Sequence, residues 1–237
     1  MKNCGKSGTL IFAAVTSLVS LVVLLHISVL AGQQAENTTG SFTDPRDGEV
    51  SKWVRIGNQV WMAENLRFEP DSGSWCWENK EDNCKSRGRF YNWTTAIKVS
   101  PPGWHLPSDE EWKTLETALG LTTEQVDQEG LRIDRDSLLA GKIKLSDGWP
   151  KEYQGRPIVI SNETGFSAVN TGFYGLGEFT HEGYTSWWSS TDVDSTAWIR
   201  HIGFFANFVG RVLNNKEHAF SVRCVRDENP PGNAVDK

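Results

Sequence analysis

An uncharged apolar run near the N-terminus determines the compartment in which most of this 237-residue chain folds. Residues 9–31 carry no formal charge apart from that of His26, and Lys2 and Lys6 precede them. A positive start followed by such a run directs the following residues out of the cytoplasm. The run exceeds the about 7–15 residues of a signal core and reaches the roughly 20 that span a bilayer. Residues 1–31 are therefore interpreted as a cleaved signal peptide or as a retained membrane anchor.

The remaining sequence predicts one exported domain with polar flanks. Residues 32–50 are polar and poor in large apolar groups, which predicts a flexible tether. Residues 51–227 predict the folded domain, and residues 228–237 predict a disordered tail. The formal net charge is −6, and no basic run exceeds two residues. A nucleic-acid partner is therefore not expected. The 11 tryptophans fit either a dense core or a surface on which a ligand stacks.

The cluster of charged residues in "HLPSDEEW" is interpreted as the start of a helix. Ser108 and Glu111 have the spacing of a capping box, in which each side chain accepts a hydrogen bond from the other residue's backbone amide. Acidic residues in the first turn also interact favourably with the positive end of the helix. Gly120 is a suitable stop. We therefore expect these carboxylates to stabilise the helix and not to form a catalytic cluster.

The other elements predict an α+β class. Residues 53–62 contain two strand-like runs joined by Gly57 and Asn58, which predicts a hairpin. Residues 89–99 and 135–145 are expected to be amphipathic helices. The later segments are short and rich in aromatic and β-branched residues, as in antiparallel strands. The expected domain has two or three helices early and an antiparallel sheet late.

The cysteines of an exported domain favour a disulfide. Cys76 and Cys84 close a short polar loop and are the natural pair, which leaves Cys224 over. Metal binding is the alternative role for these thiols, although no CxxC or HxxxH spacing supports it.

Eight segments, in order, carry a resemblance to the Fibrobacter succinogenes major paralogous domain family. This family is similar to C-type lectin-like domains and, distantly, to formylglycine-generating enzymes. The resemblance implies an exported or surface-displayed bacterial domain. The segments are "IGNQVWMAENL" (56–66), "SWCWEN" (74–79), "GRFYNW" (88–93), "GWHLPSDEEW" (103–112), "AGK" (140–142), "GFSA" (165–168), "WWSST" (187–191) and "FSVRCVRD" (220–227).

The resemblance also bears on Cys224. Family members often have a cysteine at the position of Ser100, which pairs with the cysteine of the last strand. Its replacement by serine implies that Cys224 is a free thiol. Phe220, Val222 and Cys224 alternate along a strand, so we expect Cys224 to be buried and inert.

Candidate contact residues lie in polar loops that are rich in aromatic side chains. Asp192 and Asp194 are weak candidates for a calcium site, against the alternative of a simple strand connection. No metal or other cofactor is otherwise expected. The remaining candidates for ligand contact are Trp75, Trp77, Trp187, Trp188, Asn207 and Arg211. Trp187 and Trp188 are consecutive, and neighbours on a strand point to opposite faces. Exposure of one of the two is therefore the alternative to core packing, which is favoured for these tryptophans.

These features favour a non-catalytic extracytoplasmic module, secreted or membrane-anchored, that binds a polysaccharide or a protein at the cell surface. The scattered histidines and the missing GxSxG elbow argue against catalysis. Two alternatives remain: an enzyme or maturation factor related to formylglycine-generating enzymes, and a structural component of the cell envelope.

Overall fold

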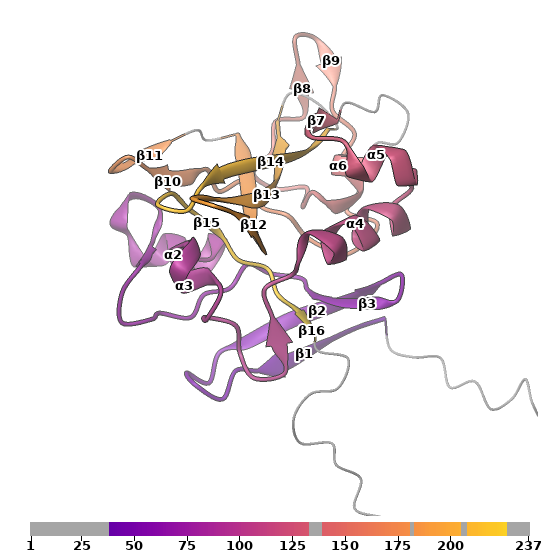
Figure 1. Cartoon of the computed structure of the whole chain (residues 1–237). Helices are drawn as coiled ribbons and strands as arrows, with labels where there is room; N and C mark the ends of the chain where they lie inside the picture. Colours follow the sequence, from indigo (N-terminus) through magenta and orange to yellow (C-terminus); the bar gives the residue numbers. More distant parts are fainter. Residues whose placement is uncertain (1–37, 133–138, 181–182, 205–207, 227–237) are drawn as a thin grey trace, which may run out of the picture. The chain divides into compact units, whose positions relative to one another are not determined.

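A computed structural model describes residues 38–132, 139–180, 183–204 and 208–226 (Figure 1). The expected signal or anchor segment, the C-terminal tail and the candidate Asn207 lie outside these residues. Within the described ranges, no helix is long and apolar enough to cross a membrane.

A small five-stranded sheet brings the start and the end of the domain together (Figure 1). The predicted hairpin is confirmed: β2 (Val50–Ile56) and β3 (Gln59–Met62) pair across Gly57, whose φ is +60°. β3 then pairs with β16 (Val225–Arg226), which pairs with β6 (Trp104–His105). Pairing between β3 and β16 places Val225 opposite Trp61 and closes the domain.

The fifth strand of this sheet, β1 (Thr39–Thr43), corrects the expected tether. All five of its residues pair with β2, from Thr39 opposite Val54 to Thr43 opposite Val50. The side chain of Phe42 stacks on Trp104, with 4.6 Å between the ring centroids. Residues 38–50 have few large apolar groups, but backbone pairing with β2 and one aromatic anchor hold them in the sheet. The domain therefore begins before residue 51.

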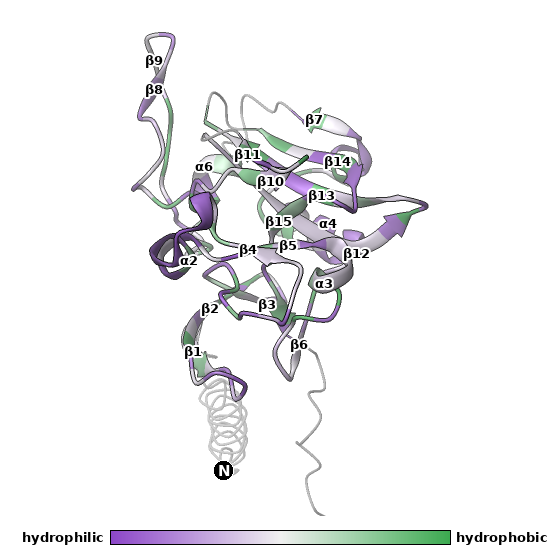
Figure 2. Ribbon diagram, turned by 90° about the vertical axis from the view of Figure 1, so that its left-hand side faces the viewer, coloured by the Kyte–Doolittle hydropathy of each residue, from purple (hydrophilic) through white to green (hydrophobic). Residues whose placement is uncertain are grey.

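The larger sheet contains most of the late sequence, as predicted. Its pairs are antiparallel except for β12 with β15, and the long β12 and β13 lie at its centre. In spatial order its main strands are β11 (Glu178–Thr180), β10 (Phe173–Gly175), β15 (Ala219–Ser221), β12 (Tyr184–Val193), β13 (Thr196–Gly203), β14 (Val209–Asn215) and β7 (Gly130–Arg132). Two further strands, β5 (Phe90–Asn92) and β4 (Ser74–Trp75), extend from β15. A separate hairpin, β8 (Glu152–Tyr153) with β9 (Arg156–Pro157), projects from the body of the domain in both views (Figures 1 and 2).

The helices are short, and five α-helices are described where two or three were expected. They are α2 (Glu81–Arg87), α3 (Trp93–Ala96), α4 (Asp109–Ala118), α5 (Thr123–Asp127) and α6 (Leu139–Ile143); a 3₁₀ turn, η1 (Trp77–Asn79), precedes α2. The helix expected over residues 89–99 is reduced to α3, because β5 pairs with β15 and Asn92 caps the helix by accepting from the Thr95 amide. The chain is thus α+β, with few helices and mostly antiparallel sheets.

Both faces of the larger sheet are covered by apolar side chains. Trp187 lies in a cluster with Trp61, Trp112 and Phe166, whereas its neighbour Trp188 lies in another cluster. Both side chains are thus buried, with exposed fractions of 1% and 0%, which corrects their candidate role in ligand contact. Adjacent strand residues do point to opposite faces, but at β12 each of these faces packs against core.

Candidate functional site

The start of α4 confirms the interpretation of "PSDEEW" as a helix start. The Ser108 hydroxyl accepts from the Glu111 amide, and the Glu111 carboxylate accepts from the Ser108 amide at 2.7 Å. The second oxygen of Glu111 lies 2.6 Å from Nε2 of His105. Burial raises the pKa of Glu111, but the hydrogen bonds from His105 and Ser108 outweigh burial and leave this pKa lowered. One oxygen of the Glu111 carboxylate is thus engaged in the cap, and the other is engaged with His105.

Asp109 and Glu116 from α4 enter a buried ionic cluster that the sequence did not reveal. Asp109 accepts from Arg200 at 2.8 Å and from Arg211 at 2.7 Å, and Glu116 accepts from Arg200 at 2.7 Å. Arg132 pairs with Glu116 at 2.6 Å. Burial raises the pKa of Asp109, but hydrogen bonds and charge from Arg211 and Arg200 leave it lowered. One signal was available: Glu116 lies four residues after Trp112, on the apolar stripe of the helix.

This cluster corrects the expectation that Arg211 contacts a ligand. Its guanidinium is held by Asp109 and lies 3.7 Å from the centre of the Trp198 ring. Arg211 is 7% exposed. The arginines of this cluster are thus already paired with the carboxylates of Asp109 and Glu116, and Arg211 also stacks on Trp198. We therefore assign the cluster a structural role.

The candidate calcium ligands lie beside a lysine. Nζ of Lys216 donates to the Asp192 carboxylate at 2.5 Å and to the Asp194 carbonyl at 2.7 Å. The same ammonium group lies 4.2 Å from the centre of the Trp93 ring. Asp194 has a φ of +53° at the turn between β12 and β13. The ammonium of Lys216 thus lies where a cation between these two residues would bind.

The aromatic candidates are not gathered on one open surface. Trp75 is half-buried and stacks on Tyr174 with 4.8 Å between ring centroids. Trp77 is 7% exposed and packs against Phe90 and Phe179, which corrects its expected role in ligand contact. Both tryptophans flank Cys76 in the sequence, and their contacts with these aromatic rings hold them in place. Only Trp75 of the four named tryptophans keeps partial exposure.

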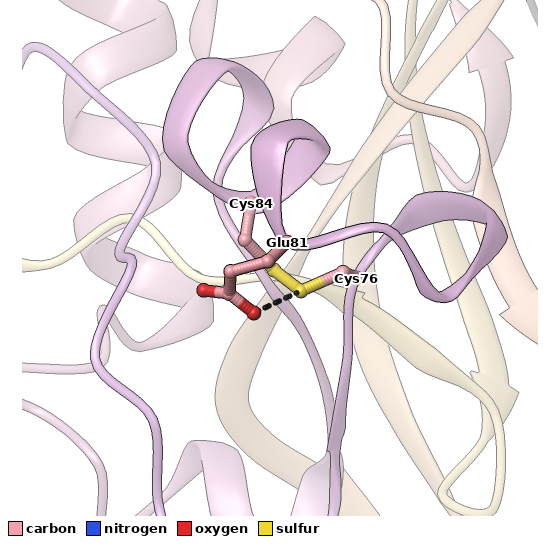
Figure 3. Close-up of side chains that lie close together, drawn as sticks. All are labelled: Cys76, Glu81 and Cys84. Carbon is pink, nitrogen blue, oxygen red and sulfur yellow. Dashed lines mark hydrogen bonds between the residues drawn. A yellow bond between two sulfur atoms is a disulfide. The ribbon is translucent and has the colours of Figure 1, made fainter.

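The predicted disulfide joins Cys76 to Cys84 and connects the 3₁₀ turn to α2 (Figure 3). A carboxylate oxygen of Glu81 lies 3.2 Å from Sγ of Cys76, and both oxygens of Glu81 accept from Arg89. The three ligand-type atoms lie within 4.8 Å of one another. Because each sulfur is bonded to the other, the pair serves as a crosslink in this structure, and Arg89 compensates the charge of Glu81.

A cleft with basic walls lies beside β1 and β2, and we call it the basic cleft. It has a volume of about 580 Å³ and is also lined by the segment after α2 and by residues near Gly165. Its hydroxyl and amide lining comes from Thr39, Ser41, Asn65, Ser86 and Ser167. Its charged lining residues are Lys52, Arg67, Lys85, Arg87, Arg223 and a single acid, Glu64. No histidine or cysteine is among the lining residues.

Asn65 organises the inner end of the basic cleft. Its Oδ1 accepts from Arg223 at 2.7 Å and from the Trp187 indole at 2.9 Å, and its Nδ2 donates to the carbonyl of Arg87 at 2.9 Å. Gly88, with a φ of +82°, lets the chain pass close: a Cβ there would lie 2.4 Å from Cβ of Asn65. A larger residue at position 88 would displace the Arg87 segment.

Arg223 is a buried cation whose hydrogen-bond acceptors in the described part of the chain are all neutral. Its guanidinium donates to Asn65 and to the carbonyls of Phe166 and Met62, and it lies 4.3 Å from the centre of the Phe166 ring. It is 0% exposed, and burial lowers its pKa to about 9. The sequence pattern does not single out Arg223 as a buried cation. Its position between Val222 and Cys224, two inward residues of the expected strand, is the one signal of burial that the sequence offers.

Cys224 is buried and free, as expected. Its Sγ lies 3.3 Å from the hydroxyl of Ser100. Burial raises the pKa of this thiol to about 12, against smaller lowering effects from Ser100 and Arg46. Such a thiol is a poor nucleophile.

Comparison with known proteins places the chain in a family. The model of the Fibrobacter succinogenes major domain matches residues 54–226. No curated protein and no solved structure matches the chain. The family match spans the ionic cluster, the disulfide and the small sheet from the end of β2 onward. The chain therefore belongs to the Fibrobacter succinogenes major domain family.

Proposed function

We propose that the protein is a non-catalytic extracytoplasmic module that binds a polysaccharide or a protein at the cell surface. The observation that carries this proposal is the basic cleft: a cavity of about 580 Å³ lined by hydroxyl, amide and basic side chains. Cavities of roughly 300–1,000 Å³ with a few convergent polar groups are typical of ligand sites. The basic cleft thus replaces the aromatic-rich polar loops that the sequence indicated as the contact surface.

Export is supported by the N-terminal hydrophobic sequence and by the disulfide. A Cys76–Cys84 bond persists in oxidising compartments outside the cytoplasm. The N-terminal segment would present the domain at the membrane if it is retained, and would release the domain if it is cleaved. The finer fold assignment, a C-type lectin-like domain, also belongs to this proposal and is supported by the α+β class with mostly antiparallel sheets.

Catalysis of the formylglycine-generating type has little support in the side chains. That chemistry requires reactive cysteines, whereas Cys224 is buried beside Ser100 and the other two cysteines of the domain form a disulfide. The proposal also includes no calcium, because Lys216 engages both Asp192 and Asp194. A melting temperature of the intact protein that does not change on addition of calcium or of chelator is the expected result.

The binding proposal is tested with the intact protein in a glycan array and in a pull-down from envelope extracts. Asn65→Ala is unsuitable as a test variant, because Asn65 also holds Arg223 and Trp187. We choose Ser86→Trp, which places bulk at an exposed lining position, and compare it with Ser146→Trp, at an exposed position outside the cleft lining. Loss of binding in the first variant alone supports the proposal. Absence of any ligand, or equal binding by both variants, contradicts it.

A further inference from the structure

The charge of the basic cleft is opposite to that of the chain. The protein carries a formal net charge of −6, yet the cleft is lined by five basic residues and one acidic residue. Lys52 and Lys85 are exposed at its walls. A cavity lined by one sign of charge concentrates ligands of the other sign. The ligand that the lining favours is therefore an anion.

The partners of these basic residues leave positive charge available. Arg67 lies 3.6 Å from the lining acid Glu64 and 3.7 Å from the exposed Glu49, and Lys85 lies 3.2 Å from Asp82. The Lys85–Asp82 pair is exposed and both contacts of Arg67 are longer than 3.5 Å, so these pairs are weak and compete poorly with a bound ligand. At the inner end, Arg223 donates only to neutral oxygen atoms. A buried cation that has no hydrogen bond to a carboxylate among the described residues gains from an anion placed in the adjoining cavity.

The uncharged lining distinguishes between classes of anion. Hydroxyl groups from Thr39, Ser41, Ser86 and Ser167 lie among the basic side chains. A hydroxyl group can both donate and accept, which matches the ring hydroxyls of a sugar. The hydroxyls of Ser86 and Ser167 already donate to the carbonyls of Asp82 and Gly165, so toward a ligand they act as acceptors. A uronic acid unit combines one carboxylate with such hydroxyls, and a cavity of about 580 Å³ is of ligand size. An acidic peptide offers the charge but not the hydroxyls.

We propose that the basic cleft binds an acidic polysaccharide through the carboxylates of its uronic acid units. This inference rests on the proposed binding function and names its ligand class. Lys52 and Lys85 contact the carboxylate, the hydroxyls of Thr39 and Ser41 bind the sugar hydroxyls, and Arg223 contributes its charge from the inner end.

The experiment is calorimetric titration of the intact protein with polygalacturonate. Its fully methyl-esterified form has the same backbone without the charge, and polyglutamate has the charge without the sugar. Methyl-esterification and replacement by polyglutamate are each expected to weaken binding at least tenfold. The double variant Lys52→Glu/Lys85→Glu is also expected to weaken binding at least tenfold, since both side chains are exposed and their exchange leaves the core intact. Lys151→Glu, on the exposed residue before the β8–β9 hairpin, controls for charge alone and should bind as the wild type does.

The outcomes separate this inference from the function on which it rests. If the protein binds neutral polysaccharides or the methyl ester as well as it binds polygalacturonate, and Ser86→Trp abolishes that binding, the module stands and the acidic ligand class is wrong. Equal binding of polyglutamate, or a Lys52→Glu/Lys85→Glu variant that binds like Lys151→Glu, likewise overturns the inference. If the protein binds none of the three polymers, the inference is rejected as well.

Discussion

The hydroxyl oxygen of Ser100 lies 3.3 Å from the sulfur of Cys224. Ser100 precedes the Pro101–Pro102 turn that leads into β6, and Cys224 precedes β16, the strand paired with β6. The two side chains thus connect segments that are 124 positions apart in the sequence. A disulfide has a sulfur–sulfur distance of about 2.05 Å, which a small movement of either side chain would allow. Ser100 occupies the position at which the family resemblance implies a cysteine.

Ser100→Cys is therefore expected to form a disulfide with Cys224 and to stabilise the domain. Closing so long a loop contributes about 5 kcal/mol in the chain-entropy model. Thiol counting by mass spectrometry and the melting temperature with and without reductant measure the effect. Ser100→Ala is the matched control, and its melting temperature should show no added response to reductant. If Ser100→Cys keeps both thiols free under oxidising conditions, the two segments are not held as close as described.

The Cys224 thiol of the native protein is expected to resist modification. It is 0% exposed, and burial raises its pKa to about 12, so very little thiolate exists at pH 8. A Cys4→Ser background removes the other thiol outside the disulfide. In that background, a maleimide should label Cys224 only after addition of denaturant. Labelling of the folded protein within minutes would show that the segment between β15 and β16 opens readily.

Asp109→Asn tests the buried ionic cluster. It keeps the size of the side chain but removes the charge that faces Arg200 and Arg211. Removing one partner of a buried ion pair costs about 3–5 kcal/mol, because the remaining charges stay buried. The free energy of unfolding in urea measures this loss. Glu110→Gln, on the exposed next residue of the same helical turn, should change it by less than about 0.5 kcal/mol. Equal effects of the two substitutions would contradict the structural role of Asp109.

Local signals were sufficient for the elements that depend on neighbours in sequence. The capping box of Ser108 and Glu111, the Gly57 turn and the Cys76–Cys84 bond each depend on residues at most eight positions apart. Each is set by the chemistry of a few nearby groups, such as an amide that needs an acceptor or two thiols across a short loop. The late antiparallel strands were predicted from their composition for the same reason.

Contacts between distant segments explain what the sequence did not show. A polar β1 becomes a strand because β2 offers a pairing edge, and both Trp187 and Trp188 are buried because core covers both faces of β12. The basic cleft likewise combines β1, the end of α2 and Arg223, which lie far apart along the chain. Neither strand pairing nor convergence of charges has a periodic signature in a single sequence.

Lys144 gives the domain an expected dependence on alkaline pH. It is 0% exposed, its Nζ donates to the Gly203 carbonyl at 2.7 Å, and burial lowers its pKa from 10.5 to about 8. Between these values the unfolded chain holds a proton that the folded amine has lost. The stability that Lys144 contributes is therefore present above pH 10.5, falls as the pH is lowered, and is lost below about pH 8.

The variant Lys144→Met isolates this contribution from the other groups that titrate at alkaline pH. The difference in unfolding free energy between wild type and variant should change in favour of the wild type by up to about 3 kcal/mol across the window. Urea unfolding at several pH values measures it, with the exposed Lys151→Met as the control for loss of a lysine. A difference that stays constant with pH would mean that the buried amine keeps its proton.

Leu176 at the tip of the β10–β11 hairpin is expected to be replaceable with a gain in stability. Gly175 pairs with Glu178, so Leu176 and Gly177 form a two-residue loop, with φ of +54° and +85°. Such a loop favours asparagine followed by glycine, because a leucine in the left-handed region is strained by about 1–2 kcal/mol. Leu176 is 94% exposed, so Leu176→Asn removes strain without loss of packing and should raise the unfolding free energy by about 1 kcal/mol. Leu131→Asn, at an exposed position within β7, should lower it instead, because asparagine is unfavourable in strands. A loss of stability in Leu176→Asn would mean that the leucine side chain makes a stabilising contact in solution.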